Sequence, residues 1–398
     1  MKIRFFSYFY PPCVGGGEVI LQHQAEELAR RGHTVHVHTT TYTNLNLAET
    51  TEPGTRVENG VTVHRHASFA LPFKNPLEAD AVTPGFLPDL LGPADLLVCM
   101  GYPSLHLDAL SARARLTHTP LVVQNYVTAD FLAEILTGAG GVNKRVRAAY
   151  WRRWAAPLLR RAALVIADSP AAGAALRERL GLANVRVHIG MAVDPAEFDG
   201  VSEEARRAVR ARLGLGTDRL VLAPSRLSRQ KGADLLVKAM APLFAAHPGW
   251  RLVIPGAVNE PAFADEVRAL AAPLGDRIVF GPTSRPELCA LFREADVVCL
   301  PSRGETVGGV VFEGMYNRAL AIVSDAVEAA RDDYLCHEKN GLLVPAEDVD
   351  ALGAAVHRAM TEDLSPQRAA GRSMVEARFT WPKSVDRLWS LYEEALRA

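Results

Sequence analysis

The stretch at residues 296–315, DVVCLPSRGETVGGVVFEGM, decides the fold assignment of this chain. Its apolar run predicts a buried strand ending at about Ser302, and the glycines that follow predict a turn. We expect a helix to open near Gly308 and to continue through Met315. A strand, a glycine loop and a helix in this order are typical of a parallel α/β sheet. The unpaired amides of Thr306 to Val310 would then form an anion site at the helix N-terminus.

The same alternation of apolar runs and helix-period segments extends along the chain in both directions. Parallel sheets with helices on both faces are therefore expected in two doubly wound α/β domains. The glycine- and proline-containing segment 181–200 breaks the rhythm and predicts the crossing between domains. We place the first domain at 1–183, the second at 184–375 and an amphipathic C-terminal helix at 376–398. Ligands of such domains bind at strand carboxyl ends, in the cleft between them.

Composition narrows the class of protein. The chain has 398 residues, 48% hydrophobic and 22% charged, with a net charge of −1. This near-neutral balance argues against nucleic-acid binding. Five scattered cysteines without a CxxC pair fit reduced thiols better than a disulfide or zinc framework. With no visible signal peptide and no apolar run of about 18 residues, we expect a soluble cytoplasmic protein.

Two glutamates in the opening stretch point to the ligand. Neither Glu305 nor Glu313 suits a phosphate, but both can accept hydrogen bonds from hydroxyl groups. An anion site between two carboxylates matches a nucleotide-sugar, which carries ribose, diphosphate and sugar in that order. A dinucleotide is disfavoured, because VGGGE at 14–18 replaces G-x-G-x-x-G and no acidic residue follows the second strand. The alternative is that both glutamates are solvated surface charges.

Two basic residues support a diphosphate. Arg226 and Lys231 lie on the loop after the first strand of the second domain. Fixed cations there would stabilise the charge that develops on a departing nucleoside diphosphate. Each charge-assisted bond contributes about 1.5–3 kcal/mol.

With these motifs the chain resembles the retaining glycosyltransferases of family 4, the glycosyl transferases group 1. The family's E-x7-E matches Glu305 to Glu313, its R-x4-K matches Arg226 and Lys231, and its G-G-x-E matches residues 15–18. The resemblance covers nearly the whole chain. It implies the GT-B fold, in which two Rossmann-like domains face each other across a cleft and the C-terminal helix returns to the first domain.

The resemblance also implies a role for each matched position. Glu313 would hold the ribose, Glu305 the donor sugar, and Arg226 with Lys231 the diphosphate. The catalytic set would be Glu305, Arg226, Lys231 and Asn125. The donor-binding set would be Gly16, Gly17, Arg226, Lys231, Gly256, Gly281, Pro282, Thr283, Glu305, Thr306, Val307, Gly308, Gly309 and Glu313. The acceptor-binding set would be Glu18, Tyr102, Asn125 and Tyr126. Transfer would proceed with retention and without a metal or other cofactor.

Three departures from the family pattern concern the sugar and the acceptor. Gln124-Asn125-Tyr126 stands where the family usually has a histidine, and an amide cannot share a proton at neutral pH. HIGMAVD lacks the usual asparagine-glycine, and SDAVEAARDD lacks a usual glycine pair. The acceptor is expected to be a small hydrophilic molecule, such as an aminocyclitol or a natural-product intermediate, and UDP is the expected nucleotide. The alternatives are an envelope glycan or lipid acceptor, an epimerase or phosphorylase, and a catalytically silent sugar-nucleotide-binding paralogue.

Two further features, a group of histidines and a basic segment, are interpreted as structural rather than functional. His33, His36 and His38 suggest a metal, but exposed strand histidines are common and no further ligand is evident. The basic segment 144–161 fits a core-packed helix with a solvated basic face, interrupted at Pro157. Its alternative is an anionic membrane contact. The protein is expected to be a monomer or a homodimer.

Overall fold

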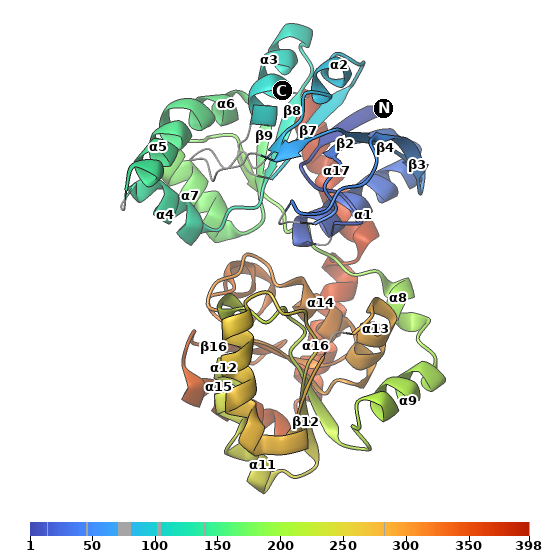
Figure 1. Ribbon diagram of the computed structural model, residues 1–398, viewed down its shortest axis with the longest axis vertical. Coiled ribbons are helices and arrows are strands. Elements are labelled where there is room, and N and C mark those ends of the chain that lie inside the picture. Colours follow the sequence, from blue (N-terminus) through green and yellow to red (C-terminus); the bar gives the residue numbers. More distant parts are fainter. Residues whose placement is uncertain are drawn as a thin grey trace. The chain divides into compact units, whose positions relative to one another are not determined.

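A computed structural model describes residues 1–13, 15–44, 47–70, 81–101, 105–138, 141–281 and 283–397. The chain divides into two compact units (Figure 1). Unit 1 comprises Met1–Met191 and Trp381–Ala398, and unit 2 comprises Ala192–Thr380. Each is an α/β unit built on a parallel sheet, as predicted.

Unit 1 contains a sheet with the strand order β10-β9-β8-β7-β1-β2-β4-β3. Its strands are parallel except for the hairpin β3–β4, whose turn has positive φ at Asn59 and Gly60. The strands are β1 (Lys2–Phe6), β2 (Thr34–Thr40), β3 (Gly54–Glu58), β4 (Val61–His66), β7 (Leu96–Met100), β8 (Leu121–Asn125), β9 (Leu164–Ala167) and β10 (Val185–Val187). Strands β5 (Phe69–Ala70) and β6 (Ala81–Val82) form a separate pair.

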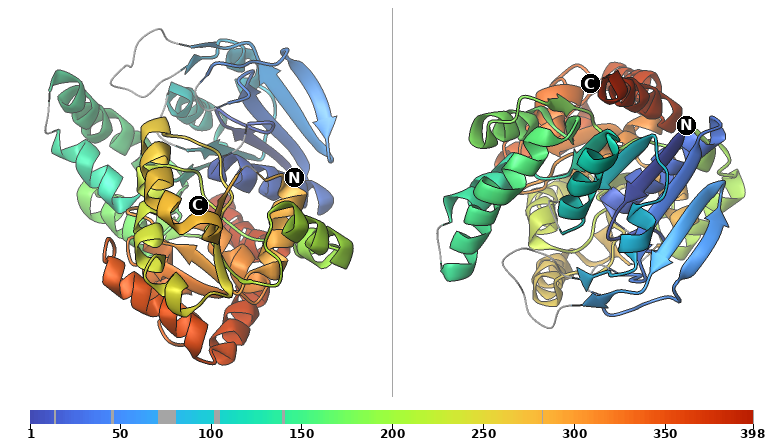
Figure 2. Two further views of the ribbon diagram at one scale, coloured as in Figure 1. Left: turned by 60° about the horizontal axis from the view of Figure 1, so that its bottom comes forward. Right: turned by 90° about the horizontal axis from the view of Figure 1, so that it is seen from above.

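Helices cover both faces of this sheet, because alternate strand residues point to opposite sides. Phe5 packs in a core with α1 and α17, whereas Phe6 packs with α3, α4, α6 and α7. The helices of unit 1 are α1 (Gly16–Arg30), α2 (Phe86–Leu90), α3 (Leu105–Thr117), α4 (Ala129–Thr137), α5 (Val142–Tyr150), α6 (Ala156–Arg161), α7 (Pro170–Leu180) and α17 (Trp381–Arg397). Figure 2 shows the C-terminal helix α17, in dark red, beside the blue N-terminal elements.

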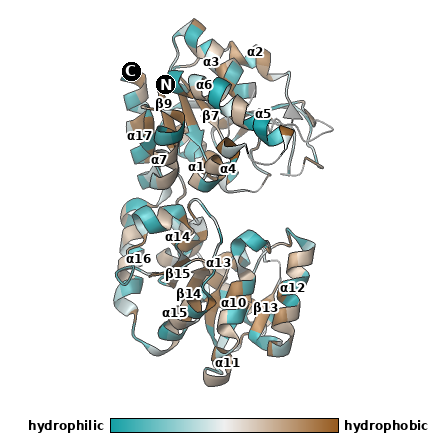
Figure 3. Ribbon diagram, turned by 90° about the vertical axis from the view of Figure 1, so that its left-hand side faces the viewer, coloured by the Kyte–Doolittle hydropathy of each residue, from teal (hydrophilic) through white to brown (hydrophobic). Residues whose placement is uncertain are grey.

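Unit 2 contains a sheet of six parallel strands in the order β13-β12-β11-β14-β15-β16, which agrees with the doubly wound parallel sheet expected there. They are β11 (Arg219–Leu222), β12 (Trp250–Ile254), β13 (Ile278–Phe280), β14 (Val297–Leu300), β15 (Leu320–Ser324) and β16 (Leu342–Val344). The α-helices are α8 (Pro195–Asp199), α9 (Glu203–Arg212), α10 (Ala233–Met240), α11 (Leu243–Ala246), α12 (Pro261–Ala271), α13 (Arg285–Glu294), α14 (Gly309–Tyr316), α15 (Val349–Thr361) and α16 (Ser365–Arg378). Strands such as β14 and β15 are apolar, whereas the helices carry hydrophilic residues on one side (Figure 3).

The division between the units differs from the sequence boundaries. The first crossing falls after Met191, inside the predicted segment 181–200 but later than the boundary at 183, because β10 pairs with β9 and so belongs to unit 1. The second falls after Thr380 rather than at 375, because the Phe379 ring stacks on Phe312 of α14. The two crossings are neighbours on unit 2, where the Val193 amide donates to the Phe379 carbonyl at 2.8 Å.

The basic segment 144–161 stays helical through Pro157, which corrects the expected interruption. A π-helical turn, Trp151–Ala155, joins α5 to α6, and Pro157 lies in the first turn of α6, where a missing amide costs little. Trp151 is buried, whereas Trp154 is 58% exposed and donates to Asp108. Among the helices of the described ranges, none is long and apolar enough to cross a membrane.

Candidate functional site

The loop between β14 and α14 leaves a row of backbone amides free. Helix α14 begins at Gly309, one residue after the predicted position. The carbonyls of Glu305 and Thr306 accept hydrogen bonds from the amides of Glu328 and Ala329, both at 2.9 Å. Within the described part of the chain, the amides of residues 306–310 donate no hydrogen bond. Because the loop carbonyls of Glu305 and Thr306 are hydrogen-bonded while the loop amides are free, the helix N-terminus is suited to an anion.

Gly308 is required by this geometry. It has φ 73°, and a Cβ there would lie 2.4 Å from Leu300 Cδ2 of β14. Any other residue would meet both backbone strain and a collision with the strand. The glycine that the sequence assigned to the donor therefore also fixes the loop against its own sheet.

Glu305 and Lys231, both assigned to the catalytic set, contact each other. The Lys231 ammonium donates to Glu305 Oε2, and both side chains are mostly buried. Lys231 ends the short 3-10 helix Arg229–Lys231, which Gly232 terminates in the left-handed conformation. A Cβ at Gly232 would fall 2.1 Å from the Pro301 carbonyl oxygen. The loops that follow β11 and β14 are thus packed together, and this contact holds the two charges side by side.

Arg226 lies near Lys231 in the sequence, but its side chain has a different partner. Its side chain is exposed and donates to the amide oxygen of Asn259 at 3.3 Å. No carboxylate of the described residues forms an ion pair with it. Its positive charge is therefore available for an anionic group.

Gly256 has a packing role that the sequence does not reveal. A Cβ on Gly256 would lie 1.8 Å from the carbonyl oxygen of Ser225, the residue before Arg226. The Leu227 amide donates to the Ala257 carbonyl at 2.9 Å. The absence of a side chain at Gly256 therefore lets the loop that carries Arg226 lie against the loop after β12.

Glu313 lies on α14 in a network that the sequence did not predict. Arg285, the first residue of α13, pairs with Glu313 Oε1 at 2.7 Å and with Glu197 Oε2 at 2.5 Å. Burial raises the pKa of Glu313, and the positive charge of Arg285 opposes that rise. Ser284 and Glu287 form a capping box, which predicts only a helix start at Arg285. No sequence signal indicates that its side chain reaches Glu313.

The residues expected to border the base lie beside this network along the chain. Gly281 follows β13 directly, and Thr283 precedes the helix cap Ser284. Pro282 lies outside the described residues. Arg285 thus connects the end of the 281–284 loop with Glu313.

In unit 1 the structure brings two of the predicted segments together. Gly16 and Gly17 form the first turn of α1, and a Cβ on Gly17 would lie 3.4 Å from the Tyr126 ring. Glu18 follows in the same turn, and burial raises the pKa of its carboxyl group. Tyr102 lies outside the described residues. Gly17 and Tyr126 are therefore neighbours, as a shared ligand site requires.

Asn125 ends β8 and is almost fully buried. Its Oδ1 accepts a hydrogen bond from the Val127 amide at 3.0 Å, whereas Nδ2 has no partner among the described residues. An unpaired buried donor costs about 1–3 kcal/mol. The neighbouring Gln124, which the sequence did not single out, donates to Gln24 Oε1 and to the Tyr392 hydroxyl.

In unit 1, a cluster of side chains around His38 could hold a metal ion. His38, His64 and Asp89 place one possible ligand atom each within 4.8 Å of one another. His38 is fully buried, which corrects its interpretation as an exposed strand histidine. The prediction also missed the neighbouring groups, because β4 and α2 bring them to His38 from elsewhere in the chain.

Sequence comparisons find relatives for both units. A family model described as "Glycosyl transferases group 1" matches residues 205–373, and one described as "Glycosyltransferase Family 4" matches residues 14–191. The D-inositol 3-phosphate glycosyltransferase of Acidothermus cellulolyticus is 33% identical over 213 residues, which cover 50% of this chain and 45% of that protein. The lipopolysaccharide core biosynthesis mannosyltransferase LpcC of Rhizobium leguminosarum bv. viciae is 33% identical over 205 residues, covering 50% and 54%. The matched segment spans about half the length of these curated relatives.

Solved structures share the fold over the full length of the chain. HepE of Anabaena, in complex with UDP and glucose, has a TM-score of 0.74 and 20% identity and covers 99% of both chains. The sucrose-phosphate synthase of Thermosynechococcus elongatus has a TM-score of 0.73 and 20% identity, covering 100% of this chain and 99% of that one.

Proposed function

Because the chain belongs to the glycosyl transferases group 1 and has their GT-B fold, we propose that it transfers a sugar from a nucleotide-sugar to a hydroxyl group of an acceptor. UDP is the favoured nucleotide. The observation that carries the proposal is the loop after β14, where free amides lie next to Glu305 and Lys231. A diphosphate fits the amides and the cation, and a sugar fits the carboxylate.

Lys231 and Glu305, two of the side chains proposed to bind the donor, pair with each other in its absence, and the donor replaces this contact. Lys231 turns from Glu305 to the diphosphate, Arg226 adds a second positive charge, and Glu305 accepts hydrogen bonds from the sugar. Glu313 accepts from the ribose hydroxyls while Arg285 keeps its carboxylate ionised. Gly16 and Gly17 allow the α1 backbone to approach the phosphates.

The reaction proceeds with retention and without a metal ion. The bond between the sugar's anomeric carbon and the diphosphate oxygen breaks, and the leaving group takes the electron pair. The acceptor oxygen attacks from the same face, and its proton passes to the leaving phosphate oxygen. Arg226, Lys231 and the amides stabilise the charge on that phosphate, which is the contribution that accelerates the step. Asn125 donates to a sugar hydroxyl.

The acceptor is a small polyhydroxylated molecule of the cyclitol or aminocyclitol class. Relatives named for D-inositol 3-phosphate support this choice. The second candidate is an envelope glycan, which the relative named for lipopolysaccharide core biosynthesis supports. Glu18, Asn125 and Tyr126 are the described residues proposed to contact the acceptor.

The first experiment is calorimetric titration of UDP, GDP and ADP into the purified protein, repeated with Glu313→Ala. We expect one nucleotide to bind best and the variant to weaken it. Glu347→Gln is the matched control, because Glu347 is exposed and pairs with Arg303 on the surface. If none of the three nucleotides binds, the donor-site assignments are wrong.

A second experiment separates the enzyme from its rivals. Nucleotide-sugars carrying the preferred base are incubated with a panel of cyclitols and glycans, and products are identified by mass spectrometry. A glycosylated product that Glu305→Ala abolishes supports transfer. An epimerised donor, a product that requires inorganic phosphate, or binding without turnover would instead indicate an epimerase, a phosphorylase or a silent binding protein.

A further inference from the structure

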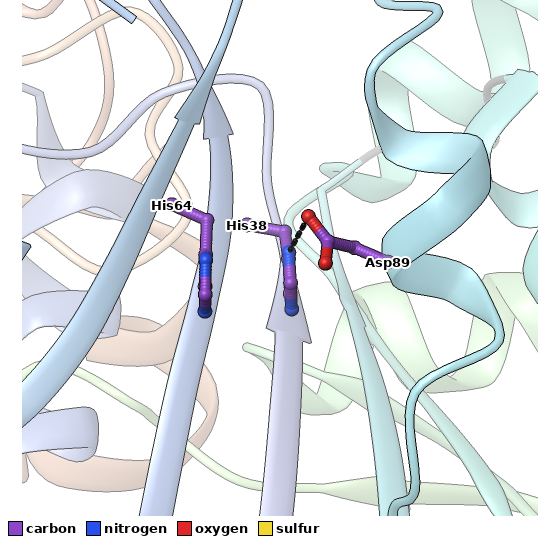
Figure 4. Close-up of side chains that lie close together, drawn as sticks. All are labelled: His38, His64 and Asp89. Carbon is purple, nitrogen blue, oxygen red and sulfur yellow. Dashed lines mark ion pairs between the residues drawn. The ribbon is translucent and has the colours of Figure 1, made fainter. Parts of the chain in front are cut away.

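We propose that unit 1 binds a divalent transition-metal ion through His38, His66 and Asp89. The three residues come from β2, β4 and α2. Figure 4 shows His38 and His64 on neighbouring strands, with Asp89 directed at His38 from the helix. This site lies in a different unit from Glu305 and Glu313.

Parallel pairing brings the histidines to one face of the sheet. His38 is the register partner of His64, and Thr40 is the partner of His66. Since alternate residues share a face, the side chains of His36 and His38 meet those of His64 and His66. Phe6 of β1 continues this surface, with its ring stacked on His38 at a centroid distance of 4.7 Å.

Three atoms form a triangle of the size that a metal ion needs. His38 Nδ1 lies 3.3 Å from His66 Nε2 and 3.7 Å from Asp89 Oδ2, and the third side, from His66 Nε2 to Asp89 Oδ2, is 3.4 Å. Tetrahedral zinc has bonds of about 2.0–2.1 Å, which place its ligand atoms roughly 3.3–3.4 Å apart. An ion close to the centre of this triangle reaches all three atoms with little rearrangement.

Hydrogen bonding alone does not satisfy these atoms. Arg4, which is always a donor, lies 3.4 Å from His38 Nε2, so a neutral His38 carries its proton on Nδ1. That proton can be given to His66 Nε2, but the lone pairs of His66 Nε2 and Asp89 Oδ2 then face each other. If His66 Nε2 carries a proton as well, its N–H group and the N–H group of His38 Nδ1 point at each other. A cation resolves the conflict, because all three atoms then act as electron-pair donors.

Arg4 limits the affinity of this site. When the ion replaces the proton on His38 Nδ1, that proton moves to Nε2, where it faces the Arg4 guanidinium. Arg4 also donates to the carbonyl oxygen of Asp89, which gives it a second partner as it withdraws from His38.

His64 lies close to the site but is not a ligand. Its ring is stacked on His38 at 4.5 Å, with the two planes 4° apart. An imidazole binds a metal in the plane of its ring, so two rings stacked face to face cannot both direct a nitrogen at one ion. His66 differs from His64, because it meets His38 nitrogen to nitrogen at 3.3 Å, with the ring centroids 5.5 Å apart. Both nitrogens of His64 are also occupied, one by His36 at 3.0 Å and the other by the Thr55 hydroxyl at 2.9 Å.

The ligand set and its exposure define the type of site. Two imidazoles and one carboxylate suit zinc and neighbouring first-row metals. Asp89 is 37% exposed, whereas His38 is 0% exposed, so the ion enters from the aspartate side. The three ligands leave a fourth position for water. The bound ion would tie the short helix α2 to the sheet.

The test uses the full chain, stripped with a chelator and titrated with Co²⁺ and Zn²⁺. We expect one equivalent to bind, with a Co²⁺ visible spectrum typical of nitrogen and oxygen ligands and a higher melting temperature with Zn²⁺. Asp89→Asn and His66→Gln should each weaken binding by about 100-fold or more. His64→Gln is the matched control and should cause a much smaller loss.

Other outcomes overturn the proposal. Absence of stoichiometric binding would show that the histidines form a metal-free hydrogen-bonded cluster. Equal binding by the unaltered chain and Asp89→Asn would place the ion elsewhere. A greater loss in His64→Gln than in His66→Gln would refute the ligand assignment. Circular dichroism of each variant confirms folding, and Asp89→Asn, which changes a partly exposed side chain, is decisive if His66→Gln does not fold.

Discussion

Two carboxylates assigned to the donor, Glu305 and Glu313, each pair with a cation of the chain itself. Lys231 neutralises the first and Arg285 the second. Each contact places a positive charge beside a mostly buried carboxylate, which offsets part of the cost of burying it. A donor bound as proposed would exchange one set of partners for another, so only the difference between the two sets would contribute to its affinity.

Arg285 should set the pH range in which the nucleotide binds. Burial raises the pKa of Glu313 and Arg285 counteracts this, so Arg285→Gln should raise that pKa further. The carboxylate would then be protonated at a higher pH. We expect the UDP affinity of the variant to fall earlier than that of the unaltered chain as pH decreases from 8 to 5.5, measured by calorimetry.

Glu197→Gln is the counter-test for this prediction, because it leaves the contact between Arg285 and Glu313 in place but removes a negative charge that raises the pKa of Glu313, so its profile should not shift towards higher pH. Identical pH profiles for the unaltered chain and Arg285→Gln would show that Arg285 does not control Glu313.

A single methyl group at Gly256 should disturb the loop that carries Arg226. Because Cβ would overlap the Ser225 carbonyl, Gly256→Ala should lower the free energy of unfolding by about 1–3 kcal/mol. It should also weaken nucleotide binding. Urea denaturation and calorimetry measure the two effects. Gly249→Ala is the matched control, since a Cβ on Gly249 would meet no atom within 4 Å. An equally large loss of stability in that variant would show that the overlap at Gly256 is not the cause.

The sequence identified residues whose role depends on their spacing along the chain. It missed residues that reach the same site from distant parts of the chain. Glu305 and Glu313 flank one loop and one helix start, so their spacing predicts their relation to the free amides. Arg285 reaches Glu313 from another helix, and nothing near it in the sequence indicates this contact. His64, His66 and Asp89 were missed for the same reason.

Among the elements, α14 and the segment 144–161 show where local patterns succeed and fail. The start of α14 was predicted to within one residue, because a glycine in the left-handed conformation marks it. The π-helical turn at Trp151–Ala155 was not predicted, because the spacing of apolar residues does not distinguish it from an α-helix. Pro157 was expected to end the helix, but it lies where its amide is not needed.

Helix α17 should contribute strongly to the stability of unit 1. Leu388 is fully buried in the core shared with α1 and the sheet. Leu388→Ala should therefore lower the free energy of unfolding by about 2–5 kcal/mol. Chemical denaturation measures the change, and Lys383→Ala, on the exposed side of the helix, is the control. Equal effects of the two variants would show that α17 adds no core to unit 1.

For the whole molecule, the order of the motifs predicted the family and the two-sheet fold, and both are confirmed. The chain crossings were placed too early, since the pairing of β10 with β9 is a long-range property. The choice of acceptor was not readable, because the residues predicted to contact it, such as Tyr126, have neighbours that come from distant segments. Site assignments such as Glu305 and Asn125 stay predictions until the variants are measured.

Stability of the whole chain should decrease in mild acid. Burial lowers the pKa of His188 to about 3, whereas an unfolded histidine titrates near 6.5. The unfolded chain therefore binds more protons below pH 6.5, so stability falls as pH decreases through 6.5 and continues to fall towards 3. Between pH 7.5 and 5.5 we expect His188 to account for a loss of about 1.4 kcal/mol.

Urea denaturation at the two pH values measures this loss, and His188→Gln should reduce it by that amount. His337→Gln is the control, because His337 lies on the surface. A pH dependence that is unchanged in His188→Gln would show that His188 is not the group responsible.

The two crossings of the chain lie side by side on unit 2, where Val193 is bonded to Phe379 and bridges Thr380. Unit 2 is consequently a cassette inserted into unit 1, with its entrance and exit at one point. A short graft between residues 191 and 381 would close unit 1 without stretching it, and residues 192–380 could be exchanged for the corresponding cassette of a relative. Such an exchange offers evolution, and protein engineers, a way to replace the loops and side chains of unit 2 while those of unit 1 are inherited intact.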